Sequence, residues 1–185
     1  MSDAAEKLID VDEYLAWAEG REGKFELHEG RVVAMAPEMA VHALVKGYAV
    51  TALNVALRRR RGECGVYADG LAVRITRRRV FIPDVVVTCP RTPDRVVETT
   101  TPLVVVEVLS PSTAAFDHGA KLEGYFSLPS LAHYLIVDPE RRLVIHHARE
   151  DGERAATRIL HGGFLRLDPP GIEVAVEDLF EPEAA

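Results

Sequence analysis

The 185-residue sequence predicts a single α/β domain, residues 1–185, with a mixed central β-sheet flanked by α-helices. Three observations support this fold class. Helical and strand-like segments alternate along the chain, and one valine-rich segment resembles a strand buried on both faces. No linker, internal repeat or low-complexity tract divides the chain. The composition, 48% hydrophobic and 28% charged, is ordinary for a globular domain.

The first third is predicted to hold a short helix, a hairpin and a long helix. Asp10-Val11-Asp12-Glu13 has capping-box spacing, which opens a helix through about residue 19. Strands at 24–28 and 31–35 are joined at Glu29-Gly30. Apolar residues then recur at helical spacing from about residue 39 to residue 61, and Gly62 ends this long helix.

The rest of the chain is predicted to be rich in strands. Segments 66–68, 71–75 and 80–88 are expected strands, and 90–101 is an expected loop. The valine-rich segment 103–109 follows, and Ser110–Thr113 breaks it and caps a helix at 114–128. A hairpin at 134–137 and 143–147, one or two further strands, and a short helix near 176–180 complete the order.

The composition also bears on location and partners. No apolar run approaches the ~20 residues that span a bilayer, and the first residues lack the regions of a secretory signal. The two cysteines, Cys64 and Cys89, make neither a disulfide framework nor a zinc site, so we expect them to stay unbridged. We therefore expect a cytoplasmic protein with no membrane partner.

Positive charge is concentrated in one segment of an acidic chain. The net charge is −7, yet residues 58–79 hold eight arginines and two acids, a segment charge of +6. Such a stripe could bind phosphate. It could equally complement a helix C-terminus and solvate a hairpin turn, and the charges alone slightly favour this second interpretation. The arginines are Arg58, Arg59, Arg60, Arg61, Arg74, Arg77, Arg78 and Arg79.

Two acids inside valine-rich strands are the most informative residues. Glu107 lies within 103–109 and Asp84 within 80–88. A lone ionised carboxylate is disfavoured there, so each must be protonated, paired or bound to a cation. On neighbouring strands the two would converge on a site suited to Mg²⁺. Lys121, on the next helix, could stabilise charge at that site or form a surface pair with Asp117.

These residues belong to stretches that together resemble a known family. Pro83-Asp84 followed by a strand with Glu107 is similar to the PD-(D/E)XK nuclease pattern. More narrowly, the chain resembles the Uma-two family of putative restriction endonucleases over roughly residues 8 to 180. The matching stretches are Phe25–Val33, His42, Ile82–Val87, Val106–Thr113, Asp117 with Lys121 and Tyr125, and Tyr134–Asp138 with Pro139.

The resemblance implies a restriction-endonuclease-like fold and a role for five residues. Asp84 and Glu107 match the metal-binding acids, and Lys121 matches a helix lysine that replaces the strand lysine of the parent pattern. Glu26 and His42 match polar positions near the site. Without the resemblance, Glu26 would be interpreted as an outward-facing strand residue and His42 as an ordinary residue near a helix start.

The expected function is Mg²⁺-dependent hydrolysis of phosphodiester bonds in DNA, with Mn²⁺ as an alternative ion and a homodimer as the expected assembly. The alternative is an inactive nuclease-fold module that binds nucleic acid or a protein. The net negative charge favours this alternative, as does Leu109, which stands where the E-x-K lysine would be. A third hypothesis is a metal-dependent enzyme that acts on a small phosphorylated substrate.

Overall fold

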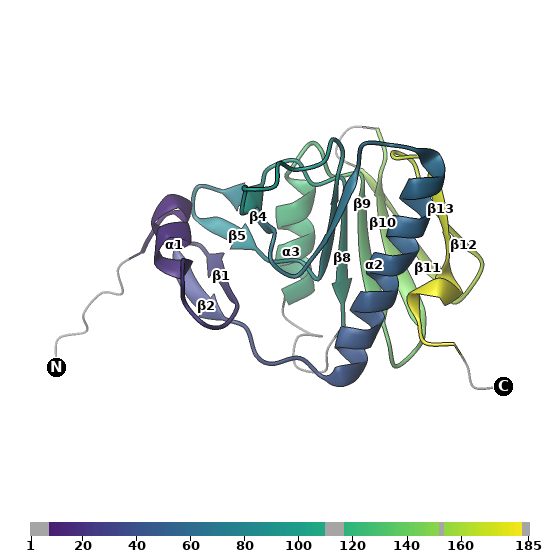
Figure 1. The fold of residues 1–185 in the computed structure, drawn as a ribbon, viewed down its shortest axis with the longest axis horizontal. Coiled ribbons are helices and arrows are strands. Elements are labelled where there is room, and N and C mark those ends of the chain that lie inside the picture. Colours follow the sequence, from purple (N-terminus) through teal and green to yellow (C-terminus); the bar gives the residue numbers. More distant parts are fainter. Residues whose placement is uncertain (1–7, 110–116, 152–153, 183–185) are drawn as a thin grey trace.

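The structure, a computed structural model, describes residues 8–109, 117–151 and 154–182. Its strands form two larger sheets and a separate hairpin, with helices packed on both faces of the central sheet (Figure 1). The expected fold class, a mixed α/β structure with flanking helices, is confirmed. The helices are α1 (Val11–Ala18), α2 (Ala40–Arg60), α3 (Asp117–Phe126) and the 3₁₀ helix η1 (Val176–Leu179).

The central sheet has six strands in the order β11-β10-β9-β8-β6-β3. Neighbouring strands are antiparallel except β8 and β9, which run parallel. The valine-rich segment forms β8, which lies inside this sheet and is buried along its whole length. The strands are β3 (Gly65–Ala68), β6 (Val85–Thr88), β8 (Val104–Val108), β9 (His133–Asp138), β10 (Leu143–Arg149) and β11 (Ala155–Leu160).

A second sheet lies beside the central one and has the order β2-β1-β5-β4-β7. The C-terminal region adds the antiparallel hairpin β12–β13, so the tail contains more strands than the sequence predicted. The strands are β1 (Phe25–His28), β2 (Arg31–Ala34), β4 (Ala72–Thr76), β5 (Arg79–Phe81), β7 (Glu98–Thr99), β12 (Phe164–Leu167) and β13 (Ile172–Ala175).

Two apolar cores lie on opposite faces of the central sheet. Alternate residues of β8 point to opposite faces. Val104, Val106 and Val108 therefore pack with α2 and the C-terminal hairpin. Val105 packs on the other face with Tyr125 of α3. The alternation also sends Glu107 toward the α3 face.

One predicted strand is wrong in an informative way. Segment 80–88 was expected to be continuous, but it forms β5 of the second sheet and β6 of the central sheet. Ile82, Pro83 and Asp84 lie between the two strands. Pro83 has no N–H to donate to a strand ladder, which favours a break there. The break carries the chain from one sheet to the other. The predicted cap at 110–113 lies outside the described residues.

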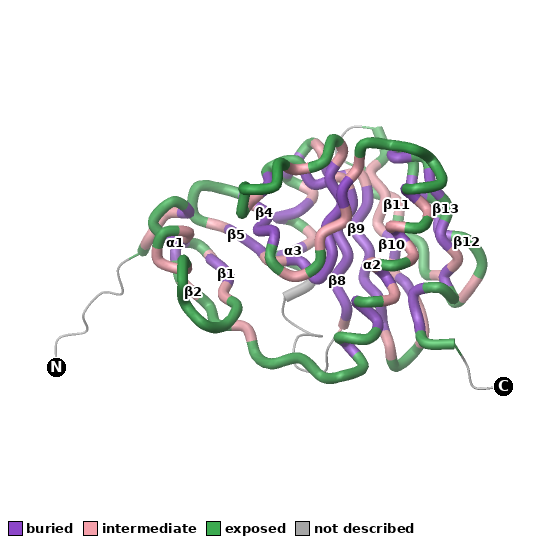
Figure 2. Tube along the Cα trace, viewed as in Figure 1, coloured by how far each residue is buried: buried purple, intermediate pink, exposed green. Residues whose placement is uncertain are grey.

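The long helix α2 is a core helix along one side only. By length and hydropathy alone it could cross a membrane. Val45, Ala49, Leu53 and Leu57, however, pack against the central sheet. The opposite side of α2 is exposed (Figure 2). Packing against the sheet accounts for the apolar residues of the inner side, but not for those of the outer side.

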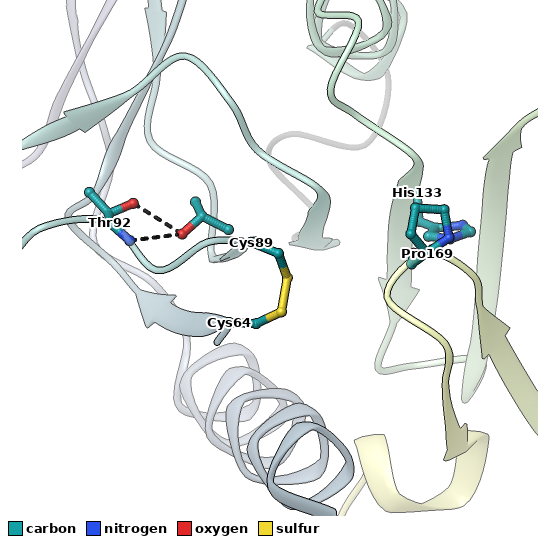
Figure 3. The surroundings of a disulfide bond; sticks show 6 residues. Cys64, Cys89, Thr92, His133 and Pro169 are labelled. Carbon is teal, nitrogen blue, oxygen red and sulfur yellow. Dashed lines mark hydrogen bonds between the residues drawn. A yellow bond between two sulfur atoms is a disulfide. The ribbon is translucent and has the colours of Figure 1, made fainter. Parts of the chain in front are cut away.

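The prediction that Cys64 and Cys89 stay unbridged is wrong. The two sulfur atoms are bonded, with the Cα atoms 4.4 Å apart (Figure 3). The pairing of β3 with β6 joins Gly65 to Thr88, and the two cysteines are the next residues along this ladder. Spacing along the sequence could not reveal this cross-strand register.

We predict that the bridge stabilises the fold. Its ends are 25 residues apart, and closing a loop of that length in the unfolded chain corresponds to about 3 kcal/mol. The variant Cys64→Ser/Cys89→Ser should lose about that much free energy of unfolding, measured by urea denaturation. Dithiothreitol should destabilise the wild type similarly and leave the double variant unchanged. Equal stability of all samples would contradict the prediction.

Candidate active site

The candidate site lies where the two sheets meet. The segment Ile82–Asp84 links the sheets, and Glu26 of β1 accepts a hydrogen bond from the backbone N–H of Ile82 at 2.9 Å. Around this junction lie the C-terminal end of β8, the first turns of α2 and the middle of α3. Residues far apart in the sequence therefore come together there.

Glu107, Lys121 and Glu26 form one buried group. The ammonium of Lys121 lies 3.2 Å from Glu107 Oε1 and 3.1 Å from Glu26 Oε1. The Tyr125 hydroxyl donates to the same Glu107 oxygen at 2.8 Å, and His28 contacts the other oxygen of Glu26 at 2.9 Å. Lys121 is only 6% exposed, so it is a buried bridge between two acids and not a solvated surface residue.

The two acids of this group differ in pKa because their surroundings differ. Burial raises the pKa of Glu107 to about 8, helped by the negative charges of Asp84 and Glu26 and opposed by Lys121. Burial also opposes ionisation of Glu26. Its hydrogen bond with His28, the charge of Lys121 and the N–H of Ile82 nevertheless lower its pKa overall. Glu26 is therefore the ionised partner of Lys121 at neutral pH, whereas Glu107 can hold a proton.

Asp84 belongs to a second group, built on the start of α2. The backbone N–H of Val108 donates to Asp84 Oδ2 at 2.7 Å, and His42 Nε2 lies 3.3 Å from the same oxygen. Lys46 Nζ lies 3.5 Å from Asp84 Oδ1, 2.7 Å from Asp69 and 2.5 Å from Glu38. Burial opposes the charge of Asp84, but the His42 hydrogen bond and charge and the Val108 N–H lower its pKa.

The contacts of His42 in this group favour its cationic form. Its Nδ1 lies 2.6 Å from Glu38 Oε2, and its Nε2 lies 2.9 Å from the carbonyl oxygen of Val108. Both ring nitrogens face acceptors, an arrangement that favours the protonated form of the ring. Burial opposes this charge, but the hydrogen bonds and charge of Asp84 and Glu38 raise the pKa of His42.

The two groups meet at the end of β8. Val85 pairs with Val106, and one step further along this register Asp84 comes beside Glu107. The Asp84 carboxylate contacts residues of α2, whereas the Glu107 carboxylate contacts residues of α3. The structure therefore brings all five predicted residues to one junction, but in two contact groups joined by the backbone of Val108.

The oxygen donors of this junction fit a hard divalent cation. Ligand atoms of Glu38, His42 and Asp84 lie within 4.8 Å of one another. His42 can ligate only through a deprotonated ring nitrogen, whereas the carboxylates of Glu38 and Asp84 are oxygen donors of the kind that Mg²⁺ prefers. Glu38 was not among the expected metal ligands. His42 and Lys46 supply, as cations, the positive charge that a metal would bring.

Comparisons with known proteins identify the family. The family model described as "Putative restriction endonuclease", Uma2, matches residues 11–177. The chain belongs to the Uma2 family. An uncharacterised protein of Synechocystis is 31% identical over 93% of this chain and 91% of its own length. A second Synechocystis protein, also uncharacterised, is 27% identical over 79% of this chain and 84% of its own length.

A solved structure supports the fold of this Uma2 chain. The crystal structure of a putative nuclease from Anabaena variabilis has a TM-score of 0.73 to it. The match covers 93% of this chain and 97% of that one, at 17% sequence identity. The restriction-endonuclease-like resemblance noted from the sequence motifs is therefore confirmed for family and fold. Together, the family and this structural neighbour indicate a nuclease of restriction-endonuclease type.

Sequence reasoning missed three members of the Uma2 site. Lys46, Asp69 and Glu38 surround Asp84 but lie in no motif that we recognised. Lys46 left a weak signal, because it follows His42 by one helical turn and is the only lysine or arginine between Ala40 and Leu57. Asp69 left none, because it follows a short strand in a turn-like stretch.

The arginines of the predicted basic stripe are not gathered at the site. Exposed residues 58–61 end α2, roughly 24 Å along the helix from His42 at 1.5 Å per residue. Three of the other arginines form local ion pairs: Arg74 with Asp12 and Glu98, Arg77 with Asp10, and Arg79 with Glu29. The stripe is thus two separate regions, and the second is largely neutralised.

We predict that Glu107→Gln flattens the pH dependence of stability. Glu107 has a pKa of about 8 when folded, against 4.5 as its ordinary value. As pH rises between these values, the unfolded chain loses the proton that the folded chain keeps. The proton on Glu107 therefore contributes fully to the free energy of unfolding below about pH 4.5, and this contribution is lost as pH rises toward 8. The wild type should lose a few kcal/mol over this range, and the variant should lose less.

The measurement is urea unfolding from pH 5 to pH 8.5 in the presence of a chelator. Glu123→Gln is the matched control, because Glu123 is an exposed acid on the same helix as Lys121. The control should follow the wild-type curve. A Glu107→Gln curve parallel to the wild type would contradict the raised pKa.

Proposed function

We propose that this Uma2 protein hydrolyses phosphodiester bonds in DNA with the help of a divalent metal ion, Mg²⁺ or Mn²⁺. The observation that carries the proposal is the position of Lys121. Leu109, at the E-x-K lysine position, packs against the apolar core. Lys121 of α3 nevertheless places its ammonium 3.2 Å from Glu107. The Lys121 ammonium thus lies beside Glu107, where the lysine of an E-x-K motif would place its own charge.

The residues of the site have distinct roles in this proposal. Asp84 and Glu38, which belong to the cluster whose ligand atoms lie within 4.8 Å of one another, would supply oxygen ligands, and Glu107 would add a carboxylate from the neighbouring strand position. A bound ion would provide Lewis acidity and an activated water. Lys121 holds positive charge where negative charge develops on the phosphoryl group. Glu26 keeps Lys121 charged and in place through its 3.1 Å contact. His42 orients Asp84 and the Val108 carbonyl.

The direct test is cleavage of supercoiled plasmid DNA with Mg²⁺, Mn²⁺ or a chelator. We expect metal-dependent nicking by the wild type and a decrease on the order of 100-fold or more for Asp84→Ala. Asp94→Ala is the control, because the Asp94 side chain is 82% exposed and pairs with Arg91, not with a residue of the site. DNA binding without cleavage would favour the inactive binding module instead.

We also predict that metal stabilises the fold through Asp84. An ion that binds only the folded state adds roughly 2.7 kcal/mol at 100 times its dissociation constant. Thermal unfolding should therefore shift upward with millimolar Mg²⁺ or Mn²⁺ for the wild type and for Asp94→Asn. Asp84→Asn should not shift, because an amide is a weak neutral ligand. An equal shift in all three proteins would place the bound metal elsewhere.

We predict that residues 58–61 contribute more to DNA affinity than Arg74, Arg77 and Arg79. The first set is exposed at the end of α2, whereas the second is paired with acids. Replacing all four residues 58–61 with glutamine should weaken binding and reduce the salt slope by up to about 4. Replacing the second set should change both quantities less. Fluorescence anisotropy across a salt series measures both, and the reverse ranking would refute the assignment.

A further inference from the structure

The outer face of α2 has no charge over most of its length. Between Ala40 and Leu57 only His42 and Lys46 have basic or acidic side chains that charge near neutral pH, and both are buried toward the site, at 7% and 5% exposure. This stretch of 18 residues is about 27 Å long. A helix that faces water normally carries charged residues on its outer side. Here the charged residues are inside and the outside is apolar.

Four exposed residues and the half-buried Tyr48 follow the spacing of a helix–helix seam. Val41, Leu44, Tyr48, Thr51 and Val55 are separated by alternating steps of three and four. Val41, Leu44 and Val55 are 43%, 50% and 44% exposed, and Figure 2 shows this side of α2 as exposed. Alternating three and four is the repeat by which two helices pack side by side. We call these five residues the α2 seam.

Gly47, beside the α2 seam, faces open space in the described part of the chain. A Cβ added at Gly47 would meet no atom within 4 Å. Glycine inside a helix costs about 1 kcal/mol relative to alanine, and no close contact among the described residues requires it here. A second backbone that approaches closely would require it. Next to the seam, α2 and η1 also enclose a groove of about 300 Å³ that includes Tyr48 and Val55.

We propose that the α2 seam packs against the α2 seam of a second copy of this chain, antiparallel and about a two-fold axis near Tyr48. In this register Val41 meets Val55 of the second copy and Tyr48 meets its counterpart. A two-fold axis makes the contact self-complementary, as in most homodimers. The seam is one helix face, so a weak dimer with a dissociation constant of roughly micromolar order is expected.

Charge selects a second copy in the antiparallel orientation. Four exposed arginines, residues 58–61, end α2, whereas its start has no arginine and carries Glu38, which is paired with His42 and Lys46. Parallel packing would bring four arginines against four arginines. Antiparallel packing brings them toward Glu38 of the other copy and aligns the helix dipoles favourably.

The dimer would bring the arginines of one chain close to the candidate site of the other chain. Residues 58–61 lie roughly 24 Å from His42 of the same chain, but next to the start of α2 in the second copy. Basic side chains of one chain would thus flank the candidate site of the other and could contact DNA bound there. This part rests on the proposed function, whereas the packing itself does not.

Association is tested by sedimentation equilibrium of the full chain from about 1 to 200 μM. The wild type should be a concentration-dependent dimer, and Leu44→Glu/Val55→Glu should stay monomeric with an unchanged urea midpoint. Val97→Glu is the control, because Val97 is 61% exposed outside the seam; it should dimerise like the wild type. A monomeric wild type, whether or not it binds lipid vesicles, or a dimeric double variant overturns the proposal.

Orientation is tested by oxidative crosslinking of Val41→Cys and Val55→Cys proteins. Antiparallel packing predicts a crosslinked dimer when the two variants are mixed, and none from either variant alone. Parallel packing predicts the opposite, and that result overturns the orientation. Because both experiments measure association and not cleavage, their failure is distinguishable from failure of the proposed nuclease activity.

Discussion

Burial of negative charge in the central sheet is the constraint on which the site depends. Asp84 and Glu107 lie beside each other at the end of two valine-rich strands, with 7% exposure each. Carboxylates in such a place require partners or protons. Asp84 has His42 and Lys46 from α2, and Glu107 has Lys121 and Tyr125 from α3. The same contacts that satisfy the acids therefore position both helices at the junction.

The break between β5 and β6 makes this junction possible. Because the chain leaves the second sheet at Phe81 and enters the central sheet at Val85, Ile82–Asp84 can connect residues of both sheets. The N–H of Ile82 satisfies Glu26, and Asp84 turns toward α2. A continuous strand through 80–88 would have kept Glu26 and Glu107 in unrelated parts of the fold. The site is thus a consequence of topology as much as of residue type.

The helix α2 combines two uncommon features. Its ionisable residues His42 and Lys46 are buried at the site, while its outer face carries exposed valine and leucine. The burial of His42 and Lys46 is explained by their ion pairs with Asp84, Glu38 and Asp69. Packing among the described residues does not account for the apolar outer face, which is why we relate it to a second copy. One helix would then connect the chemistry of the site to the assembly of the protein.

The sequence by itself determined the α/β class, the order of most elements and the acids of the site, because each of these leaves a local pattern. Capping spacing at Asp10, helical periodicity in 39–61 and valine runs around Glu107 are all readable within a few residues. The family motifs located Lys121, Glu26 and His42, although spacing alone would have made them ordinary surface residues.

Only the tertiary structure decided which of these residues touch. The disulfide between Cys64 and Cys89, the division of 80–88 between two sheets and the roles of Lys46, Asp69 and Glu38 depend on register and on contacts across long chain separations. Such contacts leave no periodic trace, because strand pairing and helix packing are set by the whole core and not by neighbouring residues. The same reason separates the arginines of one sequence segment into two distant surfaces.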